Sequence, residues 1–378
     1  MVQKRQLRSK TSKYFYGDQV IKKIKVEKSS DKQIISSIKS EKTTQLESKC
    51  DSLTKKVSKE ESNSTITIKE EEIKVEKKLQ HIEIEINQDE LTPPNIFAKV
   101  DPQDESVGPE NWSKIYNSIV KMRSKFLAPV DHQGCESMPN TITKNLKLTN
   151  PKKYRFQLLI SLMLSSQTKD EVNFEAMVKL NDALNKKHQQ GFCIEAVSQL
   201  TESEIDFYIC KVGFHNRKAV YIKKSCEILL QKHNGDIPKT IEEIIELPGV
   251  GPKMGYLLLQ CGWGITNAGI GVDVHLHRLS LMWHWISSKA KSPEKCRSEL
   301  EKWLPSRYWM DINPLIVGFG QVICVPRAPN CDICDLGRSG LCKAADKKLV
   351  KQQSITEERR VKLMKQRADL TNLLNEII

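Results

Sequence analysis

Four cysteines near the C-terminal end of the sequence could bind one metal centre. They follow the pattern Cys324-x6-Cys331-x2-Cys334-x7-Cys342, so four of the eleven cysteines fall within nineteen residues that also hold prolines and glycines. Four thiolates on loops satisfy either a tetrahedral zinc ion or a [4Fe–4S] cluster, and the spacing alone leaves both open. Four unrelated free thiols are improbable at this density. We take the other cysteines as ordinary small apolar or exposed residues: Cys50, Cys135, Cys193, Cys210, Cys226, Cys261 and Cys296.

A glycine-rich hairpin, Leu247-Pro-Gly-Val-Gly251, lies between two apolar segments and is followed at once by Pro252. Gly249 and Gly251 permit positive φ angles and a close approach of the backbone to a ligand. Free amides at the start of the next helix, together with the helix dipole, favour an anion there. The alternative is a tight turn without a ligand, which the second glycine and Pro252 disfavour. We interpret the segment as a helix-hairpin-helix motif that binds the phosphate backbone of a nucleic acid.

Lys253 lies in the first turn of the helix that this hairpin opens. A solvated charge is the usual role of a lysine. The positive end of a helix, however, disfavours a cation and so favours the neutral amine, a nucleophile suited to Schiff-base chemistry at a sugar carbon. A phosphate held at the hairpin would bring a deoxyribose close to Lys253.

Twenty residues later, Asp273 opens the segment Asp273-Val-His-Leu-His-Arg278. A helix N-cap is the default role of such an aspartate. The functional alternative is a carboxylate that handles protons at the sugar and stabilises positive charge at its anomeric carbon. Both roles can coexist. His275 and Arg278 are further candidates for this site, against the alternatives of a packed histidine and a phosphate-binding arginine.

The elements that must position these residues are helices. No long β pattern follows residue 110, so the sequence predicts an all-α protein. Trp112, Ile115, Ile119 and Phe126 recur at helical spacing up to Pro129, and residues 154–165 read as a buried helix. Helix starts and ends are indicated by capping boxes, an Asn-Gly stop and a Ser-Pro start: Thr201 with Glu204, Thr240 with Glu243, Asn234-Gly235 after residues 215–233, and Ser292-Pro293.

The net charge of +13 is unevenly distributed. Residues 1–110 hold 21 basic and 20 acidic side chains, a net charge of +1, which leaves +12 for residues 111–378. A basic folded region suits a polyanion such as nucleic acid. No apolar run is long enough to span a bilayer and no secretory leader is evident, so we expect no membrane association.

The first 110 residues combine high charge with few large apolar side chains, and we expect them to be disordered. Four apolar-Lys-x-Glu tetrapeptides there resemble acceptor sites for a small ubiquitin-like modifier, although chance is the alternative for each copy. Residues 1–17 hold five basic and no acidic side chains, which suits a nuclear signal or a mitochondrial transit peptide. We expect a protein of the nucleus, with the mitochondrion as a second location. The acceptor lysines would be Lys25, Lys39, Lys69 and Lys74.

Taken in order, these features resemble the endonuclease III family of DNA glycosylase/AP lyases, and its eukaryotic members most closely. The resemblance spans roughly residues 112–345, and no counterpart to the tail is apparent. The segments that carry it are Met163–Asp170, Val212–Phe214 with Arg217 and Lys218, Leu247–Met254, Val272–Arg278, Trp303–Pro305, Val317–Gln321 and the cysteine loop.

The resemblance implies a role for each matching residue. Lys253 matches the Schiff-base lysine and Asp273 its partner aspartate. Gln167 matches the residue that fills the gap left by an extruded base, and Phe214 the apolar wedge that enters the opposite strand. Gly249, Val250 and Gly251 match the phosphate-binding hairpin, and the four cysteines match cluster ligands, which favours [4Fe–4S] over zinc.

One position departs from the family pattern. The usual spacing places the last cysteine two residues earlier, at Gly340, whereas here it is Cys342. A longer loop can still deliver the thiolate, so the resemblance still implies a cluster. Adenine-glycosylase relatives lack the lysine and 8-oxoguanine glycosylases generally lack the cysteine cluster, so the presence of both points to oxidised pyrimidines such as thymine glycol.

The resemblance also implies an architecture of two helical lobes with a DNA cleft between them. We expect a disordered tail (1–110), a helical barrel with the helix-hairpin-helix (152–272), a discontinuous iron–sulfur lobe (111–151 with 273–345) and a C-terminal extension (346–378) that docks on the core or on a partner. The expected activity is that of a monomeric bifunctional DNA glycosylase/AP lyase acting on damaged or abasic double-stranded DNA. The alternatives are a non-catalytic DNA-binding scaffold, a glycosylase with another lesion preference, and an iron–sulfur electron carrier, which would leave the hairpin unexplained.

Overall fold

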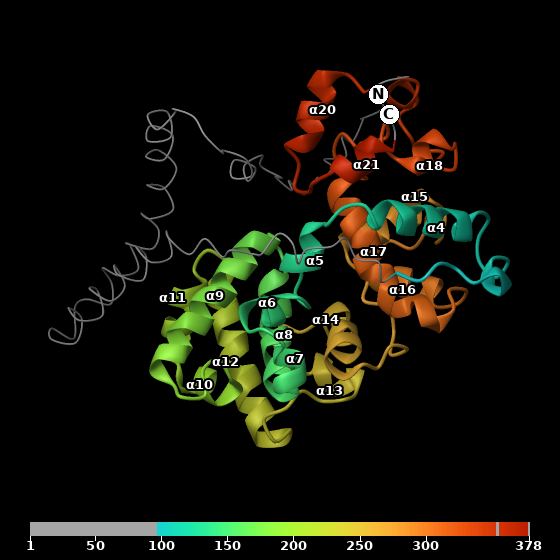
Figure 1. Cartoon of the computed structure of the whole chain (residues 1–378). Helices are drawn as coiled ribbons and strands as arrows, with labels where there is room; N and C mark the ends of the chain where they lie inside the picture. The colour runs from blue at the N-terminus through green and yellow to red at the C-terminus, as the bar shows by residue number, and fades with distance from the viewer. Residues whose placement is uncertain (1–96, 353–354, 377–378) are drawn as a thin grey trace, which may run out of the picture.

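The computed structural model describes residues 97–352 and 355–376, and every regular element in this part of the chain is helical (Figure 1). The prediction of an all-α fold is therefore confirmed. None of these helices is long and apolar enough to cross a membrane. The predicted modification sites Lys25, Lys39, Lys69 and Lys74 lie outside the described residues, as does the basic segment 1–17.

One hydrophobic core is built around α8 (Pro151–Ser165), whose side chains are buried on nearly every face, as its composition predicts. The flanking helices bury apolar faces against it and form the green-to-yellow lobe of Figure 1. The other helices of this lobe are α6 (Met138–Ile142), α7 (Leu146–Thr149), α9 (Asp170–Lys187), α10 (Ile194–Gln199), α11 (Glu202–Ile209), α12 (His215–Lys232), α13 (Ile241–Ile245), α14 (Pro252–Leu257) and the π-helical turn η3 (Leu258–Gly262).

A second core draws on both ends of the described chain, which makes this lobe discontinuous. Its centre is an aromatic cluster in which the rings of Trp112 and Trp303 lie 5.2 Å apart and those of Tyr116 and Tyr308 lie 5.6 Å apart. Its helices are η2 (Pro102–Asp104), α4 (Trp112–Arg123), α5 (Pro129–Gln133), α15 (Val274–Met282), α16 (Pro293–Leu300), η4 (Ser306–Tyr308), α17 (Trp309–Val322), α18 (Asp335–Arg338), α19 (Lys347–Val350), α20 (Glu357–Met364) and α21 (Thr371–Asn375).

Two predicted boundaries differ from the structure. Residues 97–110 were expected to be part of the disordered tail, yet Val100 is buried and the Asp104 carboxylate accepts a hydrogen bond from the Tyr308 hydroxyl at 2.9 Å. The average composition of residues 1–110 does not indicate that its last residues make these few contacts. Residues 138–151 were expected in the iron–sulfur lobe, but Met138 and Leu146 bury their side chains in the core around α8.

The C-terminal extension docks on the second core. Leu363, Leu370, Leu373 and Leu374 are at most 1% exposed there, so of the two alternatives for this segment the structure supports docking on the core.

The predicted N-caps are confirmed, although Thr240 and Glu243 do not complete a capping box. Thr201 and Glu204 form a capping box, and Thr240 and Ser292 accept hydrogen bonds from the third helical residue. The first helix, by contrast, ends at Arg123 rather than continuing to Pro129, which opens α5 instead.

Candidate active site and metal centre

The predicted hairpin joins α13 to α14 through residues 246–251. Gly249 has a φ of 78°, and a Cβ there would collide with the Tyr221 ring, so both the backbone and the packing require glycine. Gly251 differs from the prediction because its φ is −106°. A Cβ at Gly251 would meet no heavy atom within 4 Å, so the backbone there is open to a ligand.

Val250, matched to the same hairpin, does not present its side chain to a ligand. The residue is 7% exposed and belongs to the core around α8, and its N–H donates to the Leu247 carbonyl at 3.1 Å. Val250 therefore packs inside the turn and holds it in place, and its contact with DNA as part of the hairpin stays a prediction.

Lys253 lies in the first turn of α14 and is partly exposed. Among the described residues, none forms a hydrogen bond or ion pair with its amine. Its charge acts on Cys135, Asp170 and His275, groups that come from different parts of the chain. The amine of Lys253 is thus within electrostatic range of groups from both lobes.

Asp273 is the N-cap of α15, and its Oδ1 accepts a hydrogen bond from the Leu276 N–H at 2.7 Å. The predicted cap is confirmed. The second carboxylate oxygen remains for other partners, and the side chain is only partly buried. A Cβ on nearby Gly271 would lie 3.3 Å from the Lys253 carbonyl oxygen, so the residues that precede Asp273 run past the backbone of Lys253.

The neighbouring candidates have other roles. His275 is 5% exposed and packs so closely on α17 that a Cβ on Gly320 would lie 2.6 Å from its Nδ1. Burial lowers its pKa, which favours the neutral ring. The Arg278 guanidinium donates to the Cys324 carbonyl at 2.6 Å and lies 3.8 Å from the Cys324 Sγ. His275 thus packs between helices and Arg278 supports the cysteine loop, while their contacts with DNA stay predictions.

Asp170, at the start of α9, is a largely buried carboxylate whose pKa responds to the charge of Lys253. The Gln321 side chain donates to its Oδ2 at 2.9 Å and accepts from the Val130 N–H at 3.0 Å, which links α9, α17 and α5. Burial raises the pKa of Asp170, against the opposing charges of Arg367 and Lys253. Its signal in the sequence was its place in the Ser-Ser-Gln-Thr-Lys-Asp segment that also holds Gln167.

Gln167 and Phe214, the two residues expected to enter the duplex, lie on adjacent loops. Both have left-handed backbone conformations, with φ of 52° at Gln167 and 59° at Phe214. Both side chains are exposed, and Phe214 is 59% exposed despite its apolar ring. Strained, exposed residues of this kind are typical of positions with a function.

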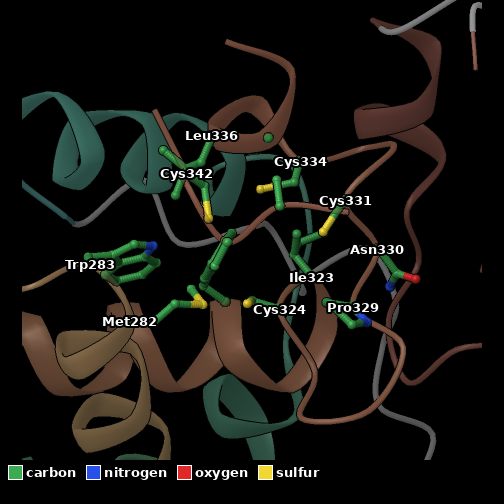
Figure 2. A pocket seen from close by; sticks show the side chains of 14 residues that line it. Met282, Trp283, Ile323, Cys324, Pro329, Asn330, Cys331, Cys334, Leu336 and Cys342 are labelled. Atoms are coloured by element: carbon green, nitrogen blue, oxygen red, sulfur yellow. The ribbon is translucent and has the colours of Figure 1, made fainter. Parts of the chain in front are cut away.

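The four predicted cysteine ligands line one pocket on the second lobe, as Figure 2 shows. The empty space is about 360 Å³, part of it open to solvent, and apolar side chains including Met282, Trp283 and Leu336 surround it. As these side chains stand, no group of three His, Cys, Asp or Glu residues among those described is arranged to hold a single metal ion.

The chemistry of this donor set fits a metal group that binds thiolates. Burial raises the pKa of the Cys334 thiol to about 12 and also raises the pKa values of Cys324 and Cys342. The thiols therefore remain protonated at neutral pH unless a cationic centre replaces their protons. Four converging thiols in an apolar pocket fit a [4Fe–4S] cluster.

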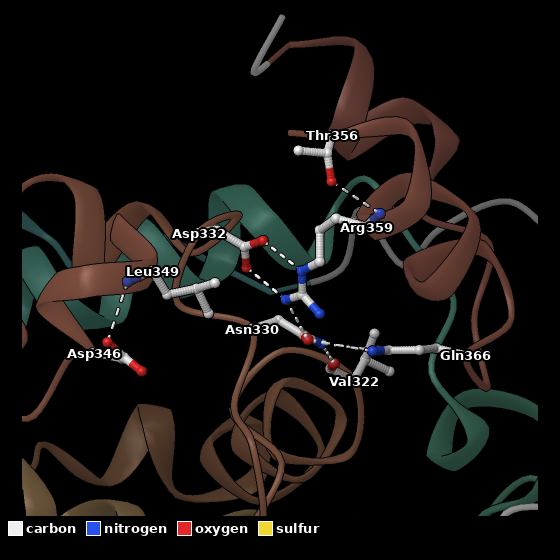
Figure 3. A network of polar contacts seen from close by, with 8 residues as sticks. All are labelled: Val322, Asn330, Asp332, Asp346, Leu349, Thr356, Arg359 and Gln366. Carbon is white, nitrogen blue, oxygen red and sulfur yellow. Dashed lines mark hydrogen bonds and ion pairs between the residues drawn. The ribbon is translucent and has the colours of Figure 1, made fainter. Parts of the chain in front are cut away.

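The cysteine loop is braced by the C-terminal extension (Figure 3). Arg359 of α20 makes a bidentate ion pair with Asp332, with Nε–Oδ2 and Nη2–Oδ1 distances of 2.6 and 2.7 Å, and also donates to Asn330 Oδ1 at 2.9 Å. Gln366 exchanges hydrogen bonds with Asn330 at 2.8 and 3.2 Å. Asp332 lies between two of the cysteines, so this network fixes the loop that carries them.

Comparison with known proteins matches residues 160–306 to the family of HhH-GPD superfamily base excision DNA repair proteins. The endonuclease III homolog of Schizosaccharomyces pombe is 44% identical over 263 residues, which cover 70% of each chain. The endonuclease III-like protein 1 of Gallus gallus is 40% identical over 243 residues, covering 63% of this chain and 82% of its own. A solved structure of a trapped endonuclease III–DNA covalent intermediate is 25% identical, with a TM-score of 0.46, and the match covers 59% of this chain and 99% of that one.

The match to the Schizosaccharomyces pombe protein covers more than two thirds of that protein's length. The same chain holds the lysine that follows the glycine hairpin, the capping aspartate and the cysteine pocket. The chain belongs to the endonuclease III family of base excision repair DNA glycosylases.

Proposed function

We propose that the protein is a bifunctional DNA glycosylase/AP lyase in which Lys253 is the nucleophile and Asp273 its partner. The observation that carries the proposal is the position of Lys253 in the first turn behind the hairpin, with its amine unpaired among the described side chains. A lysine amine without a partner can act as a nucleophile toward a sugar carbon.

The reaction begins when the damaged base leaves the stack, at least cost where the lesion already pairs or stacks poorly. Lys253 Nζ forms a bond to the anomeric carbon of the sugar, and the N-glycosidic bond breaks with its electron pair leaving on the base. The amine releases a proton, which the Asp273 carboxylate can accept and pass on. Asp273 also stabilises the positive charge that develops at the sugar.

The bond between the anomeric carbon and the ring oxygen then breaks, and the ring oxygen keeps the electron pair and takes up a proton. This opens the sugar and leaves it joined to Lys253 as an imine, from which the lyase step follows. Loss of a proton from the carbon next to the imine breaks the bond to the 3′ phosphate, which leaves with the electron pair. The strand is thereby cut on the 3′ side of the lesion by β-elimination, and water then releases the amine.

The DNA contacts of the proposal come from three loops. The backbone at Gly249 and Gly251 would hold a phosphate next to the lysine. Gln167 would fill the space of the extruded base, and Phe214 would enter the opposite strand. The proposed partner is double-stranded DNA with a damaged or abasic site, and we propose that a monomer binds it.

The cofactor of the proposal is a [4Fe–4S] cluster held by Cys324, Cys331, Cys334 and Cys342. When bound, it would cross-link the loop through four thiolate bonds, and we assign it no step in the reaction. Arg278 supports the proposal because its guanidinium joins this loop to α15, the helix that Asp273 caps.

The proposed substrates are oxidised pyrimidines such as thymine glycol, since the lysine and the cysteine loop occur together. A nuclear location, with the mitochondrion as a second site, and modification of the tail lysines stay predictions.

The test is borohydride trapping on duplexes that each carry one oxidised pyrimidine or an abasic site. Wild-type protein should form a reduced covalent adduct and nick the strand, and Lys253→Gln should do neither. Lys232→Gln, which removes an exposed lysine at the end of α12, is the matched control and should behave as wild type. An adduct formed by Lys253→Gln would refute the assignment.

The second candidate is a non-catalytic protein that uses the hairpin only to bind DNA. It predicts tight binding by the wild type with no release of base and no adduct on any lesion. Base release without an adduct would instead indicate a glycosylase that lacks lyase activity.

A further inference from the structure

Lys218 of α12 is a buried lysine without a carboxylate partner among the described residues. It is 6% exposed, and its ammonium group donates to the carbonyl oxygens of Leu164 and Ser166, each at 2.7 Å, and to the Thr168 hydroxyl at 3.3 Å. Lysines are almost never this buried unless they are paired. Its position therefore requires a specific explanation.

The end of α8 supplies that explanation. The last carbonyls of a helix lack partners within the helix and carry the negative end of its dipole, so a cation stabilises them. Leu164 is in the last turn of α8 and Ser166 is its C-cap. Burial lowers the pKa of Lys218 to about 8, so the charged amine is held there by these oxygens against an unfavourable environment.

The same contacts reach both loops expected to enter DNA. Ser166 and Thr168 flank Gln167, and the Thr168 hydroxyl that Lys218 contacts also accepts the N–H of Gly213, the residue before Phe214, at 3.2 Å. The loops lie so close that a Cβ on Gly213 would be 2.6 Å from the Gln167 carbonyl oxygen. Lys218 is thus the shared anchor of two exposed, strained residues on separate loops.

We propose that Lys218 is a positioning residue that fixes Gln167 and Phe214 relative to each other and so allows the pair to hold a base out of the duplex. The proposal rests on the proposed function, in which both side chains enter DNA. Lys218 itself contacts neither substrate nor reacting atoms. Its effect should appear in base extrusion and not in the chemistry of Lys253.

The experiment compares Lys218→Met, Lys218→Arg and the exposed control Lys224→Met from the same helix. Single-turnover trapping is measured on duplex DNA with an oxidised pyrimidine and on a single-stranded abasic oligonucleotide, which needs no extrusion. A 2-aminopurine opposite the lesion reports unstacking on binding, without any chemical step. Thermal unfolding of each variant shows whether it folds.

Lys218→Met should slow trapping on the lesion duplex about tenfold or more and reduce the 2-aminopurine signal, while trapping on the abasic oligonucleotide stays within about twofold. Lys218→Arg should recover part of the loss, and Lys224→Met should lose nothing. Should Lys218→Met fail to fold, Thr168→Val removes the shared hydroxyl while Lys218 keeps its two carbonyl partners, and the same split is expected. Equal losses on both substrates, or no loss on the duplex, would overturn the proposal.

The experiment distinguishes a failure of the Lys218 proposal from a failure of the proposed function. A failure of Lys253 to form the adduct abolishes trapping for every variant but leaves the 2-aminopurine signal of the wild type intact. The difference between Lys218→Met and the wild type in that signal then still decides the role of Lys218.

Discussion

Asp273 has two roles that substitutions can separate. Its Oδ1 caps α15, and asparagine caps a helix about as well as aspartate does. Asp273→Asn should therefore keep the stability of the wild type but lower kcat for base release by roughly 10²-fold or more, because the carboxylate charge is lost. Asp273→Ala should lose the same activity and also about 1 kcal/mol of stability. Urea unfolding and single-turnover kinetics measure the two effects; equal stability of the two variants would argue against the cap.

Lys218 should make the free energy of unfolding depend on pH. Its pKa is about 8 in the folded protein and near 10.5 when unfolded, so between these values the unfolded chain binds more protons. The free energy of unfolding contributed by Lys218 therefore rises with pH across this window, by at most about 1.4 kcal/mol per unit. Relative to Lys218→Met, the wild type should gain stability between pH 7 and pH 10, as urea unfolding of both proteins would show. An unchanged difference would mean that Lys218 does not titrate in this window.

At the scale of elements, the cysteine loop depends on α20. Removing Arg359 leaves the Asp332 carboxylate buried without its partner, a change that costs several kcal/mol at comparable sites. We expect Arg359→Ala to lose iron to a chelator several-fold faster than the wild type, and Arg359→Lys, which cannot make the bidentate contact, to be intermediate.

Absorbance near 400 nm and iron content follow this loss without any need for enzyme activity. Lys362→Ala, which removes an exposed charge from the same helix, is the control and should retain iron like the wild type. If Arg359→Ala retained iron as well as the wild type, the loop with the longer Cys334–Cys342 spacing would not need the contacts of Arg359.

At the scale of the whole molecule, the sequence correctly predicted the structural features that depend on residues close together in the chain. The caps at Thr201, Ser292 and Asp273 are local patterns, and all three were correct. The helical class and the two lobes followed from periodicity and from the family resemblance.

The errors involve contacts between distant segments. His275 is buried because α17 packs on it, and nothing near it in sequence indicates that. The role of Lys218 was not predicted because its oxygen partners lie about fifty residues earlier, at the end of α8. The order in residues 97–110 depends in the same way on Tyr308, which lies some two hundred residues later.

The charge of one amine, Lys253, acts on groups of α9 and α15, which belong to different lobes, and the catalytic proposal depends on this amine. The most direct measurement is mass spectrometry of the peptide cross-linked to DNA after borohydride reduction of the full chain on a lesion-bearing duplex. The reduced sugar should be found on Lys253 and on no other lysine. A cross-link at another residue, or complete base release with no cross-link, would contradict the assignment of Lys253 as the nucleophile.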